Sequence, residues 1–450
     1  MFAIIQFVYI SVFCKIQTLL YFVFYRVHFL CICVFCKIHL YLYEKNFYIM
    51  DKLFKRHDAE IAAVSISLVR SMMTKIDWSS RLLIIKGAKG VGKSTLMQQY
   101  IKKNYRIGDR QVLYCSADSS YFSTHTLLDM ADSFVMMGGR HLFIDEVHKY
   151  HGWSREIKEI YDTYKNLRIV LSGSSLLQLN DGDADLSRRM IPYFMPELSF
   201  REFLRFDRNV KVDAVSLVDL LDSPDEYCAS VKDKCLPVEA FKQYLQGGCY
   251  PFYFENRRTY PVQVENVVNY IIDSELPAYR NVDVGNTRKL KALLHILAQM
   301  VPYELDISKL SRATSMERPT VMKYLKNLEE SKLICRLFQN LDKISDLQKP
   351  DKILLENPNL LYVLSDQTPE IGTVREAFFC NQLIASGHKV EYGGLKTGDF
   401  KIDGDIIVEV GGADKGYDQI KGKENAYIAA DDIEFPLFRK IPLWAFGCLY

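Results

Sequence analysis

The first 49 residues contain no glycine, no proline and no aspartate, and they are crowded with Phe, Tyr, Ile, Leu and Val. Lys15, Arg26 and Lys37 interrupt this stretch, so no apolar run reaches the roughly 18–20 residues that a membrane-spanning helix needs. A signal peptide would begin with a basic region and end at a small-residue cleavage site, and neither is clear. We interpret residues 1–49 as an apolar leader translated from DNA upstream of the true start at Met50. A membrane or interfacial anchor and a soluble domain are the alternatives.

The sequence also lacks a strong excess of charge of either sign. Its 57 basic and 55 acidic residues give a net charge of +2, so no global basic field indicates nucleic-acid binding, although a local patch is compatible with this balance. The 11 cysteines show no metal-ligand spacing, because the C-x-x-C within CICVFC (31–36) has no second pair. Such cysteines are typical of reduced, buried thiols in a cytoplasmic protein. With a start at Met50, we expect no membrane association.

A glycine-rich stretch, GAKGVGKST (87–95), follows a short apolar run and precedes a helical pattern. It fits the motif G-x-x-x-x-G-K-[ST], whose glycines let backbone N–H groups approach phosphate oxygens. We expect Lys93 to reach the β- and γ-phosphates of ATP, and the Ser94 hydroxyl to bind Mg²⁺. The predicted ATP-binding residues of this loop are Gly87, Ala88, Lys89, Gly90, Val91, Gly92, Lys93, Ser94 and Thr95.

An acidic pair follows a second apolar run in HLFIDEVHKY (141–150). Adjacent acids at the carboxyl end of a buried strand lie where an open α/β sheet binds its ligand. Asp145 is expected to hold Mg²⁺ through its water shell, and Glu146 to polarise the attacking water. A surface acidic pair is the alternative, but it would not need three apolar residues before it.

Further strand-like segments alternate with helical ones, which predicts a parallel sheet covered by helices. VLYCSADSSYF (112–122) is expected to pair next to the phosphate-loop strand. NLRIVLSGSS (166–175) ends in Ser172 and Ser174, which are candidates to sense the γ-phosphate, although a serine-capped turn explains them nearly as well. Arg188 and Arg189 in DLSRRM are candidates to neutralise transition-state charge, or else surface arginines.

These motifs together resemble the prokaryotic AAA-type ATPase family whose members carry a C-terminal domain of unknown function. The resemblance rests on IDEVHKYHGWSREIKEIYD, LSGSSLLQL and MPELSFREFL, and it extends over residues 53–450. The family's Gly-Arg pair reads Arg188-Arg189 here, so the resemblance assigns the catalytic arginine to Arg189. The family's P-L-S-F run reads P-E-L-S-F, with one extra residue. Family members have a Gly-Gly-x-Pro turn after the ATPase core, similar to GGCYPF (247–252).

Residues 281–345 show a helical face in TRKLKALLHILAQM, then two further helical segments and a β-branched exit, which is a winged-helix pattern. Asp306 and Ser315 lie where helix caps are expected. The second helix of such a domain often enters a major groove. Its basic and acidic residues nearly balance, so DNA or RNA binding and a protein-docking or structural role remain equal alternatives.

The last hundred residues place Glu376 on a predicted helix, Asp399 at the end of a hairpin and Glu409 on a buried strand. This arrangement resembles the PD-(D/E)xK nuclease fold, in which two carboxylates hold a divalent metal. The lysine expected two residues after Glu409 is replaced by Gly411, and Lys415 lies four residues later. The cluster is therefore either a nuclease-like site that uses Lys415, an inactive one, or a polar cluster of ion pairs.

The predicted fold class is α/β: a P-loop parallel sheet with helices on both faces, then a helical lid, a winged helix and a small α+β nuclease-like domain. The predicted boundaries are 50–205, 206–280, 281–345 and 346–450. We expect a Mg²⁺-dependent ATPase that controls a nucleic-acid- or protein-binding C-terminal module. A regulator with slow or no turnover and an ATP-coupled nuclease are the alternatives. An arginine acting on a neighbouring chain would imply a homo-oligomer.

Overall fold

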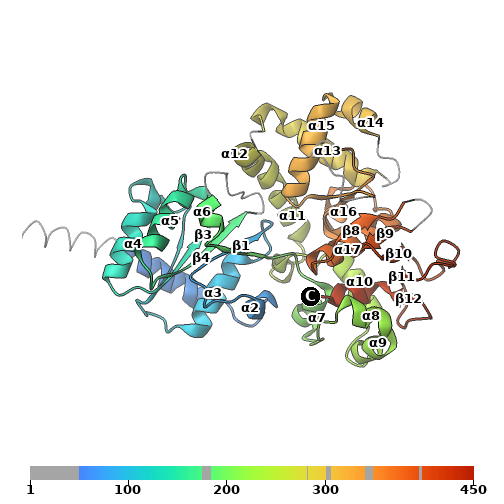
Figure 1. Cartoon of the computed structure of the whole chain (residues 1–450), viewed down its shortest axis with the longest axis horizontal. Coiled ribbons are helices and arrows are strands. Elements are labelled where there is room, and N and C mark those ends of the chain that lie inside the picture. The colour runs from blue at the N-terminus through green and yellow to red at the C-terminus, as the bar shows by residue number, and fades with distance from the viewer. Residues whose placement is uncertain (1–49, 175–183, 281, 301–305, 340–347, 395–397) are drawn as a thin grey trace, which may run out of the picture.

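The computed structural model describes residues 50–174, 184–280, 282–300, 306–339, 348–394 and 398–450 (Figure 1). The predicted leader, residues 1–49, lies outside the described residues. Nowhere in the described ranges is there a helix long and apolar enough to cross a membrane. Figure 1 shows a parallel sheet with its helices on one side of the molecule, and the helices and sheets of the C-terminal half on the other.

The N-terminal part is built on a five-stranded parallel sheet in the order β2-β3-β4-β1-β5. Successive side chains of a strand point to opposite faces, so each strand supplies two separate cores. In β1, Leu83 and Ile85 share a core with α3, whereas Leu82 and Ile84 share the other with α4 and α5. The predicted α/β fold with a parallel sheet is confirmed. The elements are β1 (Leu82–Gly87), α3 (Lys93–Asn104), β2 (Val112–Ser116), α4 (Leu127–Met136), β3 (His141–Asp145), α5 (Trp153–Thr163), β4 (Arg168–Ser174) and β5 (Ile191–Phe194).

The position of β2 corrects one prediction. Its described partner is β3, whereas β1 pairs with β4 and β5, so β2 does not neighbour the phosphate-loop strand. The prediction was wrong because it followed the tendency of strands that are close in sequence to pair. A parallel crossover can instead pass over intervening strands. A helix over residues 50–63 lies at the edge beside β2, and His57 Nδ1 accepts a hydrogen bond from the Tyr114 N–H at 3.0 Å.

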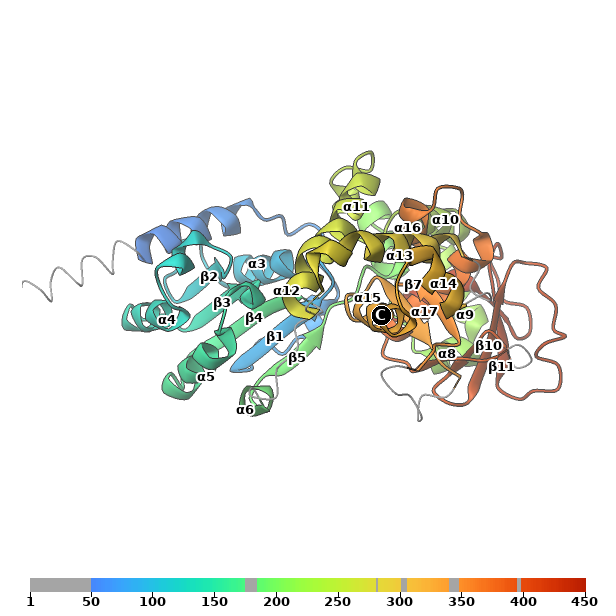
Figure 2. The same cartoon turned by 90° about the horizontal axis from the view of Figure 1, so that it is seen from above.

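Residues 200–280 form a mostly helical connector. Its first helix begins with a capping box, in which the Ser199 hydroxyl accepts from Glu202 N and the Glu202 side chain accepts from Ser199 N. Figure 2 shows the last connector helices running between the sheet and the C-terminal half. The elements are α7 (Phe200–Arg208), α8 (Leu217–Asp222), α9 (Pro224–Lys232), α10 (Pro237–Gln246), η4 (Pro251–Phe254), α11 (Tyr260–Tyr270), the π-helical η5 (Ile271–Glu275) and α12 (Leu276–Arg280).

Three helices and a two-stranded antiparallel ribbon follow the connector. Asp306 caps the second helix, because its carboxylate accepts from Ser308 N and Lys309 N, as the sequence predicts. Ser315 ends that helix in a left-handed conformation. The second strand of the ribbon lies beyond the predicted boundary at residue 345. The elements are α13 (Thr287–Gln299), α14 (Ile307–Thr314), α15 (Arg318–Glu330), β6 (Ile334–Leu337) and β7 (Lys352–Leu355).

A mixed five-stranded sheet in the order β12-β11-β10-β9-β8 ends the chain. Strands β10, β11 and β12 are parallel, whereas β8 and β9 form the predicted antiparallel hairpin and join β10. The elements are α16 (Pro358–Leu364), α17 (Ile371–Ala385), β8 (Val390–Tyr392), β9 (Phe400–Ile402), β10 (Ile406–Gly411), β11 (Ala426–Ala430), β12 (Lys440–Pro442) and η9 (Leu443–Cys448). Short elements elsewhere are α2 (Met72–Lys75), η1 (Ser120–Ser123), η2 (Val147–Lys149), α6 (Ala184–Ser187) and η6 (Val284–Asn286).

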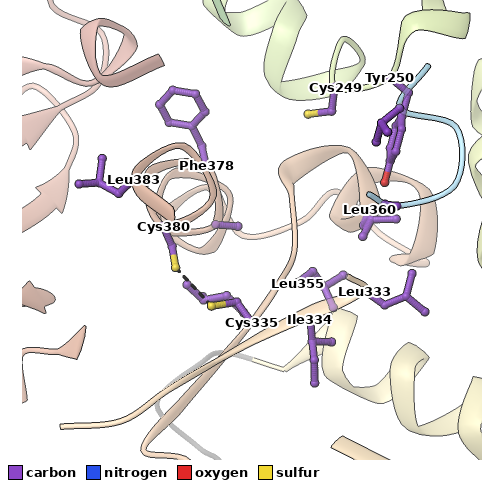
Figure 3. Close-up of a cluster of buried hydrophobic side chains, with 14 of the residues drawn as sticks. Cys249, Tyr250, Leu333, Ile334, Cys335, Leu355, Leu360, Phe378, Cys380 and Leu383 are labelled. Carbon is purple, nitrogen blue, oxygen red and sulfur yellow. Dashed lines mark hydrogen bonds between the residues drawn. The ribbon is translucent and has the colours of Figure 1, made fainter. Parts of the chain in front are cut away.

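One apolar core joins the connector, the ribbon and the C-terminal sheet. Figure 3 shows Cys249 and Tyr250 of the connector near Leu360 of α16, with Cys335 of the ribbon facing Cys380 of α17. The Sγ atoms of this cysteine pair are 3.5 Å apart, and both thiols are free. The connector, the ribbon and the C-terminal sheet are therefore packed against one another through shared buried side chains.

Candidate nucleotide site

The phosphate loop has the backbone conformation that its glycines allow. Gly90 and Gly92 have φ angles of +88° and +97°, which residues with a Cβ rarely adopt. α3 begins at Lys93 immediately after the loop, so its first backbone N–H groups point to where a phosphate would bind. The predicted sequence of strand, glycine loop and helix is therefore present.

Lys93 is buried within this loop, with 6% of its side chain exposed. Its Nζ donates to the carbonyl oxygens of Gly87 and Ala88 at 3.0 and 2.9 Å. Burial lowers the pKa of Lys93, while the nearby carboxylates of Glu146 and Asp145 act in the opposite direction. An ammonium group held beside the loop carbonyls fits the binding of an anionic phosphate chain.

The acidic pair lies at the end of β3, as predicted. Asp145 Oδ2 accepts from the Tyr114 hydroxyl at 2.7 Å, and Ser172 Oγ donates to Asp145 Oδ1. Glu146 adopts a left-handed φ of +51°, and its N–H donates to Ser172 Oγ at 3.0 Å. Burial raises the pKa of Glu146, so its carboxyl group is a stronger base than an exposed one. Asp145, Glu146 and Ser172 therefore form one hydrogen-bonded unit.

The two candidate sensor serines have different partners. Ser172 contacts the acidic pair, whereas Ser174 Oγ donates to Glu275 Oε2 at 2.8 Å. The Ser174 N–H donates to His148 Nδ1 at 3.3 Å, and His148 Nε2 lies 3.3 Å from Glu146 Oε2. Burial lowers the pKa of His148 to about 3, so this imidazole is neutral at physiological pH. Ser174 thus links the sheet to the connector.

Arg189 lies far from the phosphate loop of its own chain. Its guanidinium pairs with Asp162 at the C-terminal end of α5, with Nε 3.3 Å from Oδ1. Arg189 lies two residues before β5, whose first residue Ile191 is in register with Leu83 near the start of β1. Arg189 therefore lies near the amino-terminal ends of β5 and β1, whereas the phosphate loop follows the carboxyl end of β1. The catalytic role of Arg189 stays a prediction, and within one chain it is not brought to the site.

The structure adds contacts that no motif indicated. Arg70 Nη1 donates to the carbonyl of Val91 in the loop at 2.7 Å, and its Nε is 3.0 Å from Glu202 Oε2. Tyr270 of the connector places its ring 4.0 Å from Lys89 Nζ, a cation–π contact. These residues lie outside the loop and strand motifs, and no local sequence pattern marks them.

The C-terminal carboxylates do come together around Lys415. Its chain lies over Gly411, where an added Cβ would be 2.8 Å from Lys415 Cδ, and its Nζ is 2.9 Å from Glu409 Oε2. Burial opposes protonation of Lys415, but the carboxylates of Glu409, Asp399 and Glu376 raise its pKa. Glu376 also pairs with Lys352 Nζ of β7 at 2.8 Å. Across the described parts of the chain, no cluster of three or more His, Cys, Asp or Glu side chains is arranged to hold a metal ion.

Comparison with known proteins agrees with this geometry. Residues 79–204 match the family model of an AAA domain, and residues 238–370 match a domain of unknown function, DUF8612. The chain contains an AAA-type P-loop ATPase domain. The second match begins at α10, and it takes in the last connector helices, the three-helix unit, the ribbon and α16. The AAA domain therefore precedes a C-terminal region whose role is unknown.

The chain is homologous to two uncharacterised proteins of the archaeon Methanocaldococcus jannaschii. One is 26% identical over 60% of this chain and 60% of its own length, and the other 22% identical over 57% and 56%. The chain thus spans less than two thirds of these relatives. Among solved structures, AMPPCP-bound DnaA from Aquifex aeolicus aligns over 56% of this chain and 82% of its own, with 16% identity and a TM-score of 0.23. That score is too low for the likeness to bear on function.

Proposed function

We propose that the protein is a Mg²⁺-dependent ATPase whose nucleotide cycle controls its C-terminal half. The observation that supports this proposal is that two side chains of the connector contact the nucleotide site, one at the phosphate loop and one at the end of β4. Tyr270 lies against Lys89 of the loop, and Glu275 accepts from Ser174 at the end of β4. A change in bound nucleotide would therefore alter contacts made by the connector, and the connector shares its core with the C-terminal sheet.

Each site residue has a specific task in this proposal. Lys93 and the loop N–H groups bind the phosphates, and Ser94 and Asp145 would hold Mg²⁺, which neutralises phosphate charge when bound. Glu146 accepts a proton from the attacking water, a role favoured by the raised pKa of its buried carboxyl. Ser172 holds both acids in place through its hydrogen bonds to Asp145 and Glu146.

Substitution of Lys93 and Glu146 tests this assignment. We expect Lys93→Ala to abolish nucleotide binding, because it removes the ammonium group that lies within the phosphate loop beside the Gly87 and Ala88 carbonyls. We expect Glu146→Gln to retain binding of ATP and to lose turnover. A wild-type protein that binds ATP but hydrolyses it no faster than Glu146→Gln would instead support the slow-turnover regulator.

We further propose that the three helices and ribbon of residues 287–355 are a winged helix that binds nucleic acid. Two of its acids are held by arginines: Glu330 by Arg280 and Glu329 by Arg336. The remaining charges on the exposed surface of α14 and α15 are mainly basic, from Lys309, Arg312, Arg318 and Lys323. Such a surface suits phosphate contacts, which make binding salt-dependent.

Nucleic-acid binding can be tested with a charge-matched control. We expect Arg312→Ala with Lys323→Ala to weaken binding of duplex DNA or RNA and to reduce the slope of its salt dependence. Lys103→Ala with Lys165→Ala removes the same charge from exposed positions of the ATPase domain and should leave binding unchanged. Equal effects of the two double variants would favour a protein partner for this module.

For the C-terminal cluster we propose an ion-paired core rather than an active nuclease. Lys415 and Lys352 place ammonium groups against Glu409 and Glu376, where a nuclease would bind a metal cation. The expected result is no Mg²⁺- or Mn²⁺-dependent nicking of plasmid DNA beyond that of an Asp399→Ala, Glu409→Ala double variant. Nicking by the wild-type protein alone would establish the ATP-coupled nuclease instead.

A further inference from the structure

One acidic side chain of the connector lies at the nucleotide site. Glu275 is the last residue of η5, is 4% exposed, and accepts from Ser174 Oγ through Oε2 at 2.8 Å. Ser174 ends β4, and its register partner on the neighbouring strand is Gly87, the first glycine of the loop. Glu275 therefore reaches the edge of the phosphate loop from a helix outside the AAA domain.

A π turn explains how the connector presents two side chains to this site. Within η5 the Leu276 N–H donates to the Ile271 carbonyl, five residues earlier. In an α-helix of 3.6 residues per turn, Tyr270 and Glu275 would lie on well-separated faces. The π turn brings residues five apart closer to one face, and both side chains contact the ATPase domain. π turns of this kind are frequent at functional sites.

Glu275 also adds negative charge where the acidic pair is already present. Glu275 contacts Ser174, whose N–H donates to His148 Nδ1, and His148 Nε2 lies 3.3 Å from Glu146 Oε2. The Glu275 carboxylate therefore lies at the same end of the sheet as Asp145 and Glu146, near Lys93 and Lys89. The site thus holds three carboxylates near two lysines before any phosphate binds. An additional phosphate group close to Ser174 would be repelled by the Glu275 carboxylate, since like charges disfavour each other at short range.

We propose that Glu275 is a nucleotide-sensing residue whose carboxylate disfavours the γ-phosphate of ATP relative to ADP. Binding of ATP then releases Glu275 from Ser174 and shifts α11 and α12 away from the loop. A ligand shifts such an equilibrium only by its differential affinity for the two states, and the Glu275 charge supplies that difference. This inference rests on the proposed ATPase function and identifies the residue that couples it to the connector.

A shift of α12 would act directly on the three helices α13, α14 and α15, because α12 contacts α15. Arg280, at the end of α12, pairs through Nε with Glu330 Oε2 at the end of α15. Tyr279, also in α12, donates from its hydroxyl to the His148 carbonyl at 3.2 Å, so α12 contacts both the ATPase domain and α15. Displacement of α12 would therefore alter the position of α15, the helix with the exposed basic residues Arg318 and Lys323.

Binding of ADP and of the non-hydrolysable analogue AMPPCP to the full chain tests the inference by calorimetry. Glu275→Gln keeps the size and the acceptor oxygen for Ser174 but removes the charge. We expect it to tighten AMPPCP relative to ADP by about five-fold or more, the lower range of coupling between sites. Asp273→Asn is the matched control, because Asp273 is in the same π turn but pairs with Lys291 at the surface. An AMPPCP-to-ADP affinity ratio that Glu275→Gln and Asp273→Asn change equally would overturn the inference.

Hydrogen exchange of the wild-type protein gives a second test that needs no variant. The inference predicts faster amide exchange over residues 260–280 with AMPPCP than with ADP. Equal exchange in the two complexes would overturn it even if ATP is hydrolysed normally. A wild-type protein that binds neither nucleotide would overturn the proposed ATPase function as well, so the two failures are distinguishable.

Discussion

Arg70 and Glu202 form a buried ion pair that ties the phosphate loop to the start of α7. Their Nε and Oε2 atoms are 3.0 Å apart, and the side chains are 6% and 3% exposed. The same guanidinium donates to the Val91 carbonyl inside the loop and to the carbonyls of Pro196 and Glu197 after β5. Arg70 thus donates hydrogen bonds to backbone carbonyls of the phosphate loop and of the segment that follows β5.

Removal of Arg70 should be costly because it leaves Glu202 buried without its cation. We expect Arg70→Ala to lower the free energy of unfolding by about 3–5 kcal/mol, measured by urea denaturation. Lys242→Ala breaks an exposed ion pair with Asp432 and should cost no more than about 1 kcal/mol. Equal losses in the two variants would contradict the bracing role of Arg70.

The charge state of Glu356 should make stability depend on pH. Burial raises the pKa of Glu356 from 4.5 to about 7, with Lys332 opposing the shift and Glu197 adding to it. A raised folded-state pKa favours the protonated folded form, so this contribution is complete below pH 4.5 and is lost as pH rises through 7. Wild-type stability should fall relative to Glu356→Gln between pH 4.5 and 7, by up to about 1.4 kcal/mol per pH unit. Parallel pH profiles for the two proteins would show that Glu356 does not titrate in this window.

The sequence predicted those parts of the site that each belong to a short motif of consecutive residues. The loop begins at the carboxyl end of β1, the acidic pair lies at that of β3, and the two serines lie at that of β4. The carboxyl ends of parallel strands meet at one edge of a sheet. Contacts between distant segments left no local pattern, so Arg70, Tyr114, Tyr270 and Glu275 were not foreseen. The predicted neighbour of β2 was wrong because the length of a crossover does not determine which strands pair.

Gly90 gives a test of how closely the connector packs against the loop. Its φ is +88°, and an added Cβ would lie 2.9 Å from Phe252 Cε1 of η4. We expect Gly90→Ala to destabilise the protein and to weaken ATP binding, because both the backbone and Phe252 must move. Gly152 has a similar φ of +81° with nothing near an added Cβ, so Gly152→Ala should cost only about 1–2 kcal/mol. Unchanged ATP affinity in Gly90→Ala would contradict the close packing.

The position of Arg189 leads to a concentration test. Since Arg189 lies at the edge of the sheet opposite the loop of its own chain, we expect Arg189→Ala to retain ATP binding at all protein concentrations. If the side chain acts on a neighbouring subunit, its loss should lower the ATPase rate only at concentrations where chains associate. The checks are turnover and sedimentation across a dilution series. A uniform loss in a monomeric protein would contradict this expectation.

The C-terminal cluster shows why a residue's role is harder to predict than its location. The sequence placed Glu376, Asp399, Glu409 and Lys415 near one another, and the structure brings them together. It could not reveal Lys352, which comes from the ribbon and is 1% exposed beside Glu376. That additional buried ammonium changes the cluster from an open carboxylate site to one with ion pairs.

The most direct test of the account is phosphate release from ATP by the wild-type protein with and without Mg²⁺, measured beside Glu146→Gln. We expect Mg²⁺-dependent hydrolysis by the wild type. We expect Glu146→Gln to bind AMPPCP with unchanged affinity and to turn over about 100-fold more slowly or worse, as follows from loss of a general base. Equal phosphate release by the two proteins, with ATP bound to both, would contradict the assignment of this site as an ATPase centre.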